Sequence, residues 1–341
     1  MKHRTSRWRV VAAVASATAC LVAAGCSDND SPEDPDSISV EPLSGVESPE
    51  TSTPPSGSVV ASPSGLHSTT FDESTRSVLA LDDAATSLLI FDAGDLEAAP
   101  RTVALPGAAA DIVPTGDGAV LLPMQDELGR LDVRNAEVST TKVNGDLISA
   151  AVLAGGEIAV GDAGGSIHIV DTNSDSSRTI SGLSSVDSLA STEHGLAALD
   201  RRQTSLTQID LDGGSLGLAL RAGTGAAELT TDRYGRILVT DAAGGELLVY
   251  SSDDLLLRQR FPIGSQPWGI AYDDRSDVVW VTTPGSNEVV GYTLDTGIPV
   301  ETRRFSTVKQ PDSIAVDRDT GVVYVGSAEG EGLQRIPIGN D

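Results

Sequence analysis

The feature that most constrains the fold of this sequence is a repeat of about 40 residues running through positions 66–341. Each repeat ends in a short strand-forming segment, and successive segments begin 39 to 44 residues apart. These segments are SLLIFD (87–92), ELGRLD (127–132), SIHIVD (166–171), SLTQID (205–210), ELLVYS (246–251), EVVGYT (288–293) and GLQRIP (332–337). A period near 40 built from strands rather than helices is typical of propeller blades. The sequence therefore predicts an all-β fold, a seven-bladed β-propeller over residues 66–341.

A more apolar segment precedes each of these strands, such as VVWVT (278–282) and VVYVG (322–326). Continuous apolar runs of five residues suit strands that are covered on both faces, as strands between neighbouring blades are. Turn-forming residues such as PGSN (284–287) separate the two strand types and favour hairpins. A β-sandwich is the alternative all-β fold, but it does not require the fixed spacing.

A third strand follows each of the first six repeats, for example RTISGL (178–183). After the seventh repeat only residues 338–341 follow, which are too few for such a strand. The segment SVVAS (58–62) precedes the first repeat and has strand-forming residues. We therefore expect residues 57–62 to supply the outer strand of the last blade and to close the ring.

The N-terminus has the order of a secretory signal, with a basic segment, a 15-residue apolar stretch (10–24) and small residues before Cys26. The stretch is shorter than the roughly 20 apolar residues that a spanning helix needs. The ending LVAAGC (21–26) resembles a bacterial lipobox, which implies cleavage after residue 25 and lipidation of Cys26. The expected location is the extracytoplasmic face of the cell membrane, held by lipid chains. An ordinary signal peptide or a buried alanine-rich helix is the alternative.

Residues 26–65 are expected to form a disordered tether. Residues 27–65 hold eight Asp or Glu, seven Pro and eleven Ser, with no Lys or Arg, a composition that cannot bury enough apolar surface to order itself. The whole chain has a formal charge of −26, which argues against nucleic acid as a partner. With Cys20 inside the signal and Cys26 at its end, thiol catalysis and cysteine-based zinc sites are excluded from the rest of the chain.

The last two repeats resemble a known class of repeat propellers. The segments that carry the likeness are GSQPWGIAYDD (264–274), VVWVTTPGSNEVVGYTLDTG (278–297) and KQPDSIAVDRDTGVVYVGS (309–327). They are similar to the YVTN and NHL class. The resemblance implies a seven-bladed propeller, and such proteins include adhesive, scaffolding and ligand-binding members and some metal-dependent lactonases or lyases. Fold likeness of this kind does not by itself fix a function.

Aligning the inner strands of the repeats places one set of side chains near a single mouth of the central channel. The set is His67, Asp111, Ser149, Asp187, Glu228, Trp268 and Asp312. Carboxylate oxygens without sulfur suit a hard cation, so Asp111, Asp187, Glu228 and Asp312 are candidate ligands for Ca²⁺ or Mg²⁺. Trp268 and His67 are candidates for ligand contact. The alternative is that all of them are solvated polar residues at strand starts.

Catalytic residues are scarce in the sequence. After the signal only His67, His168 and His194 remain as histidines, and no GxSxG elbow is present. His168 is expected to face a blade surface and His194 to be solvated. We therefore predict a monomeric, non-enzymatic binding or scaffold module whose partner is an envelope protein or a small molecule. The alternatives are a metal-dependent lactonase or lyase with its site at the channel mouth, and a purely structural envelope protein.

Overall fold

The computed structural model describes residues 41–171, 177–264 and 266–339. The chain divides into two compact units, residues 1–37 and 38–341, and the first lies outside the described residues. The expected signal (1–25), the lipidation site Cys26 and the tether up to residue 40 also lie outside them. In the described ranges, no helix is both long and apolar enough to cross a bilayer.

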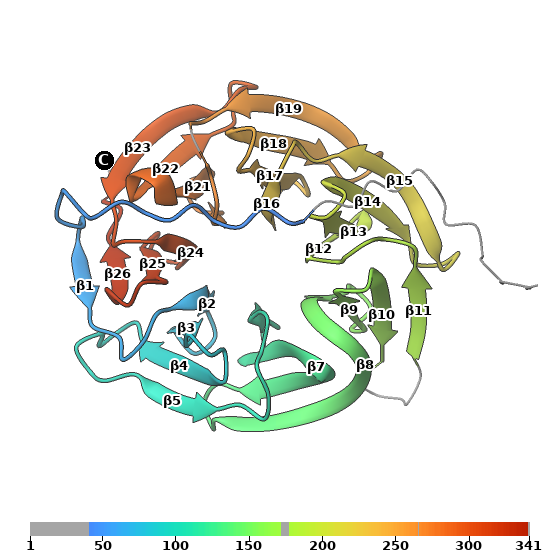
Figure 1. Ribbon diagram of the computed structural model, residues 1–341, viewed down its shortest axis with the longest axis horizontal. Coiled ribbons are helices and arrows are strands. Elements are labelled where there is room, and N and C mark those ends of the chain that lie inside the picture. Colours follow the sequence, from blue (N-terminus) through green and yellow to red (C-terminus); the bar gives the residue numbers. More distant parts are fainter. Residues whose placement is uncertain (1–40, 172–176, 265, 340–341) are drawn as a thin grey trace, which may run out of the picture. The chain divides into compact units, whose positions relative to one another are not determined.

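The described strands form six antiparallel sheets arranged in a ring, with the first strand of each repeat toward the centre (Figure 1). Five of the sheets have four strands. One sheet consists of β2 (His67–Asp72), β3 (Ser77–Leu81), β4 (Ser87–Asp92) and β5 (Arg101–Ala104), and another of β12 (Ser188–Thr192), β13 (Gly195–Asp200), β14 (Ser205–Asp210) and β15 (Ser215–Arg221). The next two consist of β16 (Ala226–Thr231), β17 (Ile237–Asp241), β18 (Glu246–Ser251) and β19 (Leu256–Pro262), and of β20 (Ile270–Asp273), β21 (Val278–Thr283), β22 (Glu288–Thr293) and β23 (Val300–Ser306). The last consists of β24 (Pro311–Val316), β25 (Val323–Ser327), β26 (Leu333–Ile336) and β1 (Ser58–Val60). A single 3-10 turn, η1 (Pro284–Ser286), joins β21 to β22.

The sixth sheet has six strands and corrects the expectation of seven blades. Its strands are β6 (Val113–Pro114), β7 (Ala119–Asp132), β8 (Glu137–Val152), β9 (Ile158–Asp162), β10 (Ser166–Val170) and β11 (Ser177–Ser181). The second and third sequence repeats share β7 and β8, each of which continues through the place where a turn was expected. The β7–β8 ladder shifts register and ends where Gln125 pairs with Asp146. Before Gln125, β7 pairs with β6, and after Asp146, β8 pairs with β9, so the two repeats are joined in one hydrogen-bonded sheet.

Buried apolar side chains lie between successive repeats rather than at the centre of the ring. Within the described ranges they gather in seven clusters. The cluster between the last and first repeats holds Phe71 and Tyr324, whose rings stack with centroids 5.7 Å apart. Because each repeat buries apolar residues on both faces of its sheet, the runs of apolar residues noted in the sequence are explained, and the polar strand starts are left to line the centre.

The ring closes with a strand from the N-terminal side of the repeats. β1 pairs antiparallel with β26, with Val59 opposite Gln334. Residues 57–62 were expected in this position, and the structure has Ser58–Val60 there. The last sheet therefore combines chain segments more than 270 residues apart.

Residues 41–57, here called the strap, differ from the expected disordered tether. The strap runs without regular secondary structure across one face of the ring to β1 (Figure 1). Its Ser48 is 4% exposed, and the Ser48 amide donates a hydrogen bond of 2.8 Å to the Gln310 side chain. Composition alone predicted disorder because it counts the apolar surface that the segment can bury, whereas the strap is held through its backbone by polar side chains of the propeller. Residues 41–56 are therefore an ordered segment of the structure where a disordered tether was expected.

Candidate functional site

A cavity of about 650 Å³ opens at one mouth of the ring. It is lined by six of the residues that the sequence alignment placed at one level, namely His67, Asp111, Asp187, Glu228, Trp268 and Asp312. Each of them lies at or near the start of the innermost strand of its repeat. Since successive inner strands run in the same direction around the ring, their first residues meet at one mouth. Ile148 lines the cavity in the remaining repeat, while the neighbouring Ser149 is buried and donates to the Val186 carbonyl oxygen at 2.7 Å.

Asp111 is held by the neighbouring repeat. The Ser68 hydroxyl donates to its Oδ1, and the Ile112 amide donates to the same oxygen at 2.8 Å. Ser68 has a φ of +47°, a left-handed conformation that is unusual for a residue with a side chain. Burial raises the pKa of Asp111 above its usual range, and the two hydrogen bonds oppose that shift.

Asp187 is fixed beside the basic residue Arg201. Asp187 Oδ2 accepts hydrogen bonds from the Ser185 hydroxyl at 2.5 Å and from the Arg201 amide at 2.8 Å. The Arg201 guanidinium lies over the Trp268 ring, with Cζ 5.3 Å from the ring centroid. Arg201 thus brings a positive charge and an aromatic contact into a mouth otherwise rich in carboxylates.

The pKa of Glu228 is raised to about 7. Burial is the main cause, the nearby charges of Asp111 and Asp187 act in the same direction, and the charge of Arg201 opposes them. The position of Glu228 is set by its backbone, because Thr240 Oγ1 accepts from the Glu228 amide at 3.1 Å. The same Thr240 hydroxyl donates to the Trp268 carbonyl oxygen at 2.8 Å and so connects the two repeats.

Asp312 and Trp268 occupy equivalent places in the sequences QPDS and QPWG. In both, a glutamine with positive φ stands two residues earlier, at +52° for Gln310 and +57° for Gln266. The Gln310 side chain donates to Asp312 Oδ1 at 2.8 Å. Burial raises the pKa of Asp312, while this hydrogen bond and the charge of His67 lower it.

The histidines have different surroundings. His67 lines the cavity, and its Nε2 lies 3.5 Å from Asp83 Oδ1. His168 pairs with Asp162 at 2.8 Å within its own sheet, outside the cavity. His194 is partly exposed, with Nε2 3.5 Å from Glu193 Oε1.

The mouth carboxylates share a cavity but do not converge on one point. Among the described residues, no three of Asp111, Asp187, Glu228 and Asp312 bring ligand atoms within 4.8 Å of one another. A Ca²⁺ ion takes six to eight oxygen ligands at about 2.3–2.6 Å. The geometry therefore does not favour one cation bound by all four residues and instead presents negative charges spread around a wider space.

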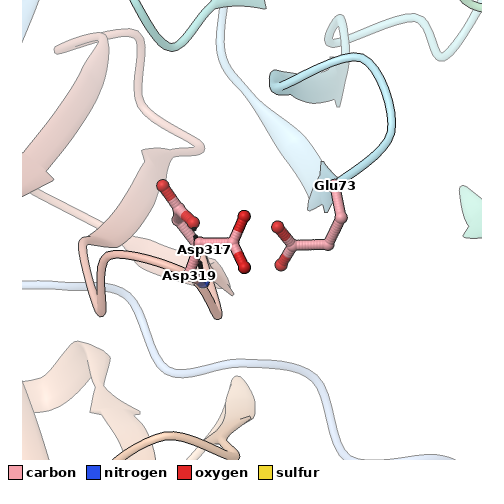
Figure 2. A group of neighbouring side chains, drawn as sticks. All are labelled: Glu73, Asp317 and Asp319. Atoms are coloured by element: carbon pink, nitrogen blue, oxygen red, sulfur yellow. Dashed lines mark hydrogen bonds between the residues drawn. The ribbon is translucent and has the colours of Figure 1, made fainter.

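Three carboxylates do meet elsewhere, where the chain leaves the inner strands. Figure 2 shows Glu73, which follows β2, facing Asp317 and Asp319, which follow β24. Arg76 donates to Asp317 Oδ1 at 2.8 Å and to Asp319 Oδ2 at 3.2 Å. The guanidinium supplies the positive charge that these carboxylates need, so the cluster is an ion-pair network between the first and last repeats.

Two parts of the mouth were not found from the sequence. Arg201 is not among the residues that the sequence singles out, because nothing in its own segment links it to Trp268 in another repeat. The strap was read as tether, yet the Arg201 guanidinium donates to the Leu43 carbonyl oxygen at 2.6 Å. At Gly45, a methyl group in place of one hydrogen would lie 3.7 Å from the Trp268 ring and 3.8 Å from Asp312 Oδ1. The strap thus lies beside two residues of the cavity.

The chain matches no protein family and no curated protein by sequence. Solved structures do share its fold. A hydrazine synthase structure from Kuenenia stuttgartiensis has a TM-score of 0.70 at 14% identity, over 85% of this chain and 99% of that one. A streptogramin B lyase structure has a TM-score of 0.69 at 13% identity, over 82% and 96%. A chain of a mitotic checkpoint complex has a TM-score of 0.72 at 12% identity, over 87% and 99%. At such identities these likenesses show the fold alone: the described residues of this chain form a β-propeller.

Proposed function

We propose that this protein is a binding module of the YVTN and NHL type that takes an organic cation in the cavity at its channel mouth. The observation that carries the proposal is the cavity of about 650 Å³ lined by four carboxylates and Trp268. A concave site of this volume is typical of small-ligand binding. Among the described residues no three of these carboxylates gather around one point, so they suit a ligand with two or more positive centres.

Calorimetry and thermal shift with a linear triamine, Ca²⁺ and citrate test this proposal. The triamine is expected to bind and raise the melting temperature, because a ligand at 100 times its Kd adds about 2.7 kcal/mol to folding stability. Ca²⁺ should bind more weakly, and citrate should not bind. In the double variant Asp187→Asn/Glu228→Gln the triamine effect should fall at least tenfold.

The matched control is Glu97→Gln/Asp212→Asn, which removes two exposed carboxylates outside the cavity. This control should bind the triamine as the unaltered protein does. Absence of heat and of thermal shift with the triamine contradicts the proposal. Equal loss of binding in both double variants also contradicts it, because it would mean that only net charge matters.

We propose further that the module is anchored through lipid on Cys26 at the extracytoplasmic face of the membrane. The support is the basic, apolar and small-residue order of positions 1–26. Labelled palmitate is expected to enter the protein in bacterial cells and to be absent from Cys26→Ala. Equal labelling of both proteins contradicts the anchor.

A second candidate function is acid–base catalysis by Glu228, favoured by the shift of its pKa to about 7. A carboxyl that titrates near neutral pH can both accept and donate a proton. A panel of lactones is a suitable probe. Turnover that disappears in Glu228→Gln but survives in Glu97→Gln supports catalysis, and no turnover removes it.

A further inference from the structure

The propeller holds the strap through backbone groups that recur at every third residue. The carbonyl oxygen of Leu43 accepts from Arg201 at 2.6 Å, that of Val46 from Gln310 at 2.9 Å, and that of Pro49 from Asn287 at 2.8 Å. A polyproline II chain has three residues per turn and no internal hydrogen bonds, so every third carbonyl points the same way. The spacing 43, 46 and 49 is the one that such a chain presents to a surface.

Ser48 adds contacts that fix the register of the strap. Its amide donates to Gln310 Oε1 at 2.8 Å, and its hydroxyl donates to the Pro284 carbonyl oxygen at 2.7 Å. Its hydroxyl also accepts from the Gln310 amide at 3.1 Å. Ser48 is 4% exposed, so these bonds are shielded from water.

The propeller side of this contact consists of buried polar side chains. Asn287 and Gln310 are 5% and 7% exposed, and both have left-handed backbones, with φ of +51° and +52°. Both side chains donate to strap carbonyls, Asn287 to Pro49 and Gln310 to Val46. Gln266 has a similar φ of +57° at the equivalent place in the preceding repeat, so the conformation is shared between repeats and the contact depends on the two buried side-chain amides.

Charge also matches between the two sides. Lys309 Nζ lies 2.9 Å from Glu50 Oε1, and the Lys309 side chain is 18% exposed. The hydrogen bond to Glu50 raises the pKa of Lys309. Glu50, which follows Pro49, is therefore paired with the positively charged Lys309 at the end of the row of backbone contacts.

We infer that the face formed by Arg201, Asn287, Lys309 and Gln310 is a peptide-binding groove, and that the strap is its ligand within the same chain. The partner that fits the groove in trans is an extended, proline-containing, acidic segment of another chain. Hydrogen bonds to backbone carbonyls select a segment by its backbone conformation and do not require particular side chains. This inference concerns a surface beside the cavity and does not rest on the proposed cationic ligand.

Hydrogen exchange of the full chain tests whether the strap is a bound ligand. The Ser48 amide, which is buried and donates to Gln310, is expected to exchange at least tenfold more slowly than in an unfolded chain. Ser48→Pro removes this donor and the hydroxyl, and should speed exchange of the Gln310 backbone amide, which donates to Ser48 Oγ. Ser52→Pro changes an exposed strap residue and should leave the exchange of the Ser48 and Gln310 amides unchanged. If the Ser48 amide of the unaltered protein exchanges as in an unfolded chain, the inference is overturned without any variant.

A labelled peptide with the sequence of residues 41–57 tests the groove in trans. It should bind full-length Ser48→Pro with one peptide per chain and at least tenfold more tightly than it binds the unaltered protein, whose own strap competes at high effective concentration. Adding Asn287→Gly, which permits the left-handed backbone but removes the amide donor, should weaken binding at least fivefold. A released strap with no peptide binding, or equal binding of the reversed sequence, overturns the inference.

Discussion

At the scale of single residues, six of the residues that the repeat alignment placed at one level line one cavity, and their chemistry depends on contacts that no alignment shows. Glu228 and Asp312 share a level, yet only Asp312 has a glutamine that donates to its carboxylate. Arg201 reaches the mouth from a loop after β13, because its amide binds Asp187 and its guanidinium covers Trp268. The spacing of the repeats therefore predicts positions and does not predict pKa values.

Replacing Glu228 with Gln should change how stability depends on pH. The carboxyl holds its proton up to about pH 7 in the folded state and releases it near pH 4.5 when unfolded. The folded state therefore binds more protons between these values, and stability falls as pH rises through this window, by about 2–3 kcal/mol in all. Urea unfolding at pH 5 and pH 8 should show a smaller drop in Glu228→Gln than in the unaltered protein or Glu97→Gln. An equal drop in all three contradicts the burial of Glu228.

At the scale of strands and segments, the sequence predicts strand boundaries well where turn-forming residues separate the strands. Glycine pairs and PGSN mark true turns, and the strands on either side begin and end close to the expected residues. The stretch PMQD (123–126) has no glycine, and Asp126 takes a φ of +60° while the strand continues. The six-stranded sheet could not be predicted, because it depends on the pairing of Gln125 in β7 with Asp146 in β8, a contact that neither segment indicates by itself.

Gly57 offers a test of how β1 joins the last sheet. Gly57 has a φ of +77°, and a methyl group there would lie 2.1 Å from the Arg335 carbonyl oxygen in β26. Gly214 also has positive φ, at +64°, with no atom within 4 Å of an added methyl group. Gly57→Ala should therefore destabilise the protein by at least about 2 kcal/mol more than Gly214→Ala, which should cost about 1 kcal/mol. Equal losses measured by thermal unfolding would mean that β1 does not hold the ring.

At the scale of the whole molecule, the ring is closed in two places between the same ends of the chain. At the outer edge β1 pairs with β26. Where β2 and β24 end, Arg76 donates to Asp317, one of the three carboxylates that Figure 2 shows. Burial opposes ionisation of Asp317, but hydrogen bonds from Arg76 and Thr320 hold its pKa below the usual range. The repeat pattern predicts that the ring must close, and only the structure shows which residues close it.

Arg76→Met should destabilise the ring strongly, because it leaves the Asp317 carboxylate, 1% exposed, without its cation. Removing one partner of a fully buried ion pair costs about 3–5 kcal/mol. The loss here should be about 2 kcal/mol, because the Arg76 side chain is 40% exposed and Asp317 keeps its hydrogen bonds from Thr320. The matched variant is Arg130→Met, whose partner Asp117 lies 2.7 Å away and is 62% exposed. Its loss should stay below about 1 kcal/mol. Similar free energies of unfolding for the two variants would show that the Arg76 network does not close the ring.

The path of the strap has a mechanical consequence. Tension applied at residue 41 reaches the contacts of Leu43, Val46, Ser48 and Pro49 one after another, and only then reaches β1. Bonds that are loaded one at a time break singly and at low force. The strap would therefore detach and extend before the force reached β1, so that a pull on residue 41 would lengthen the strap before it opened the ring.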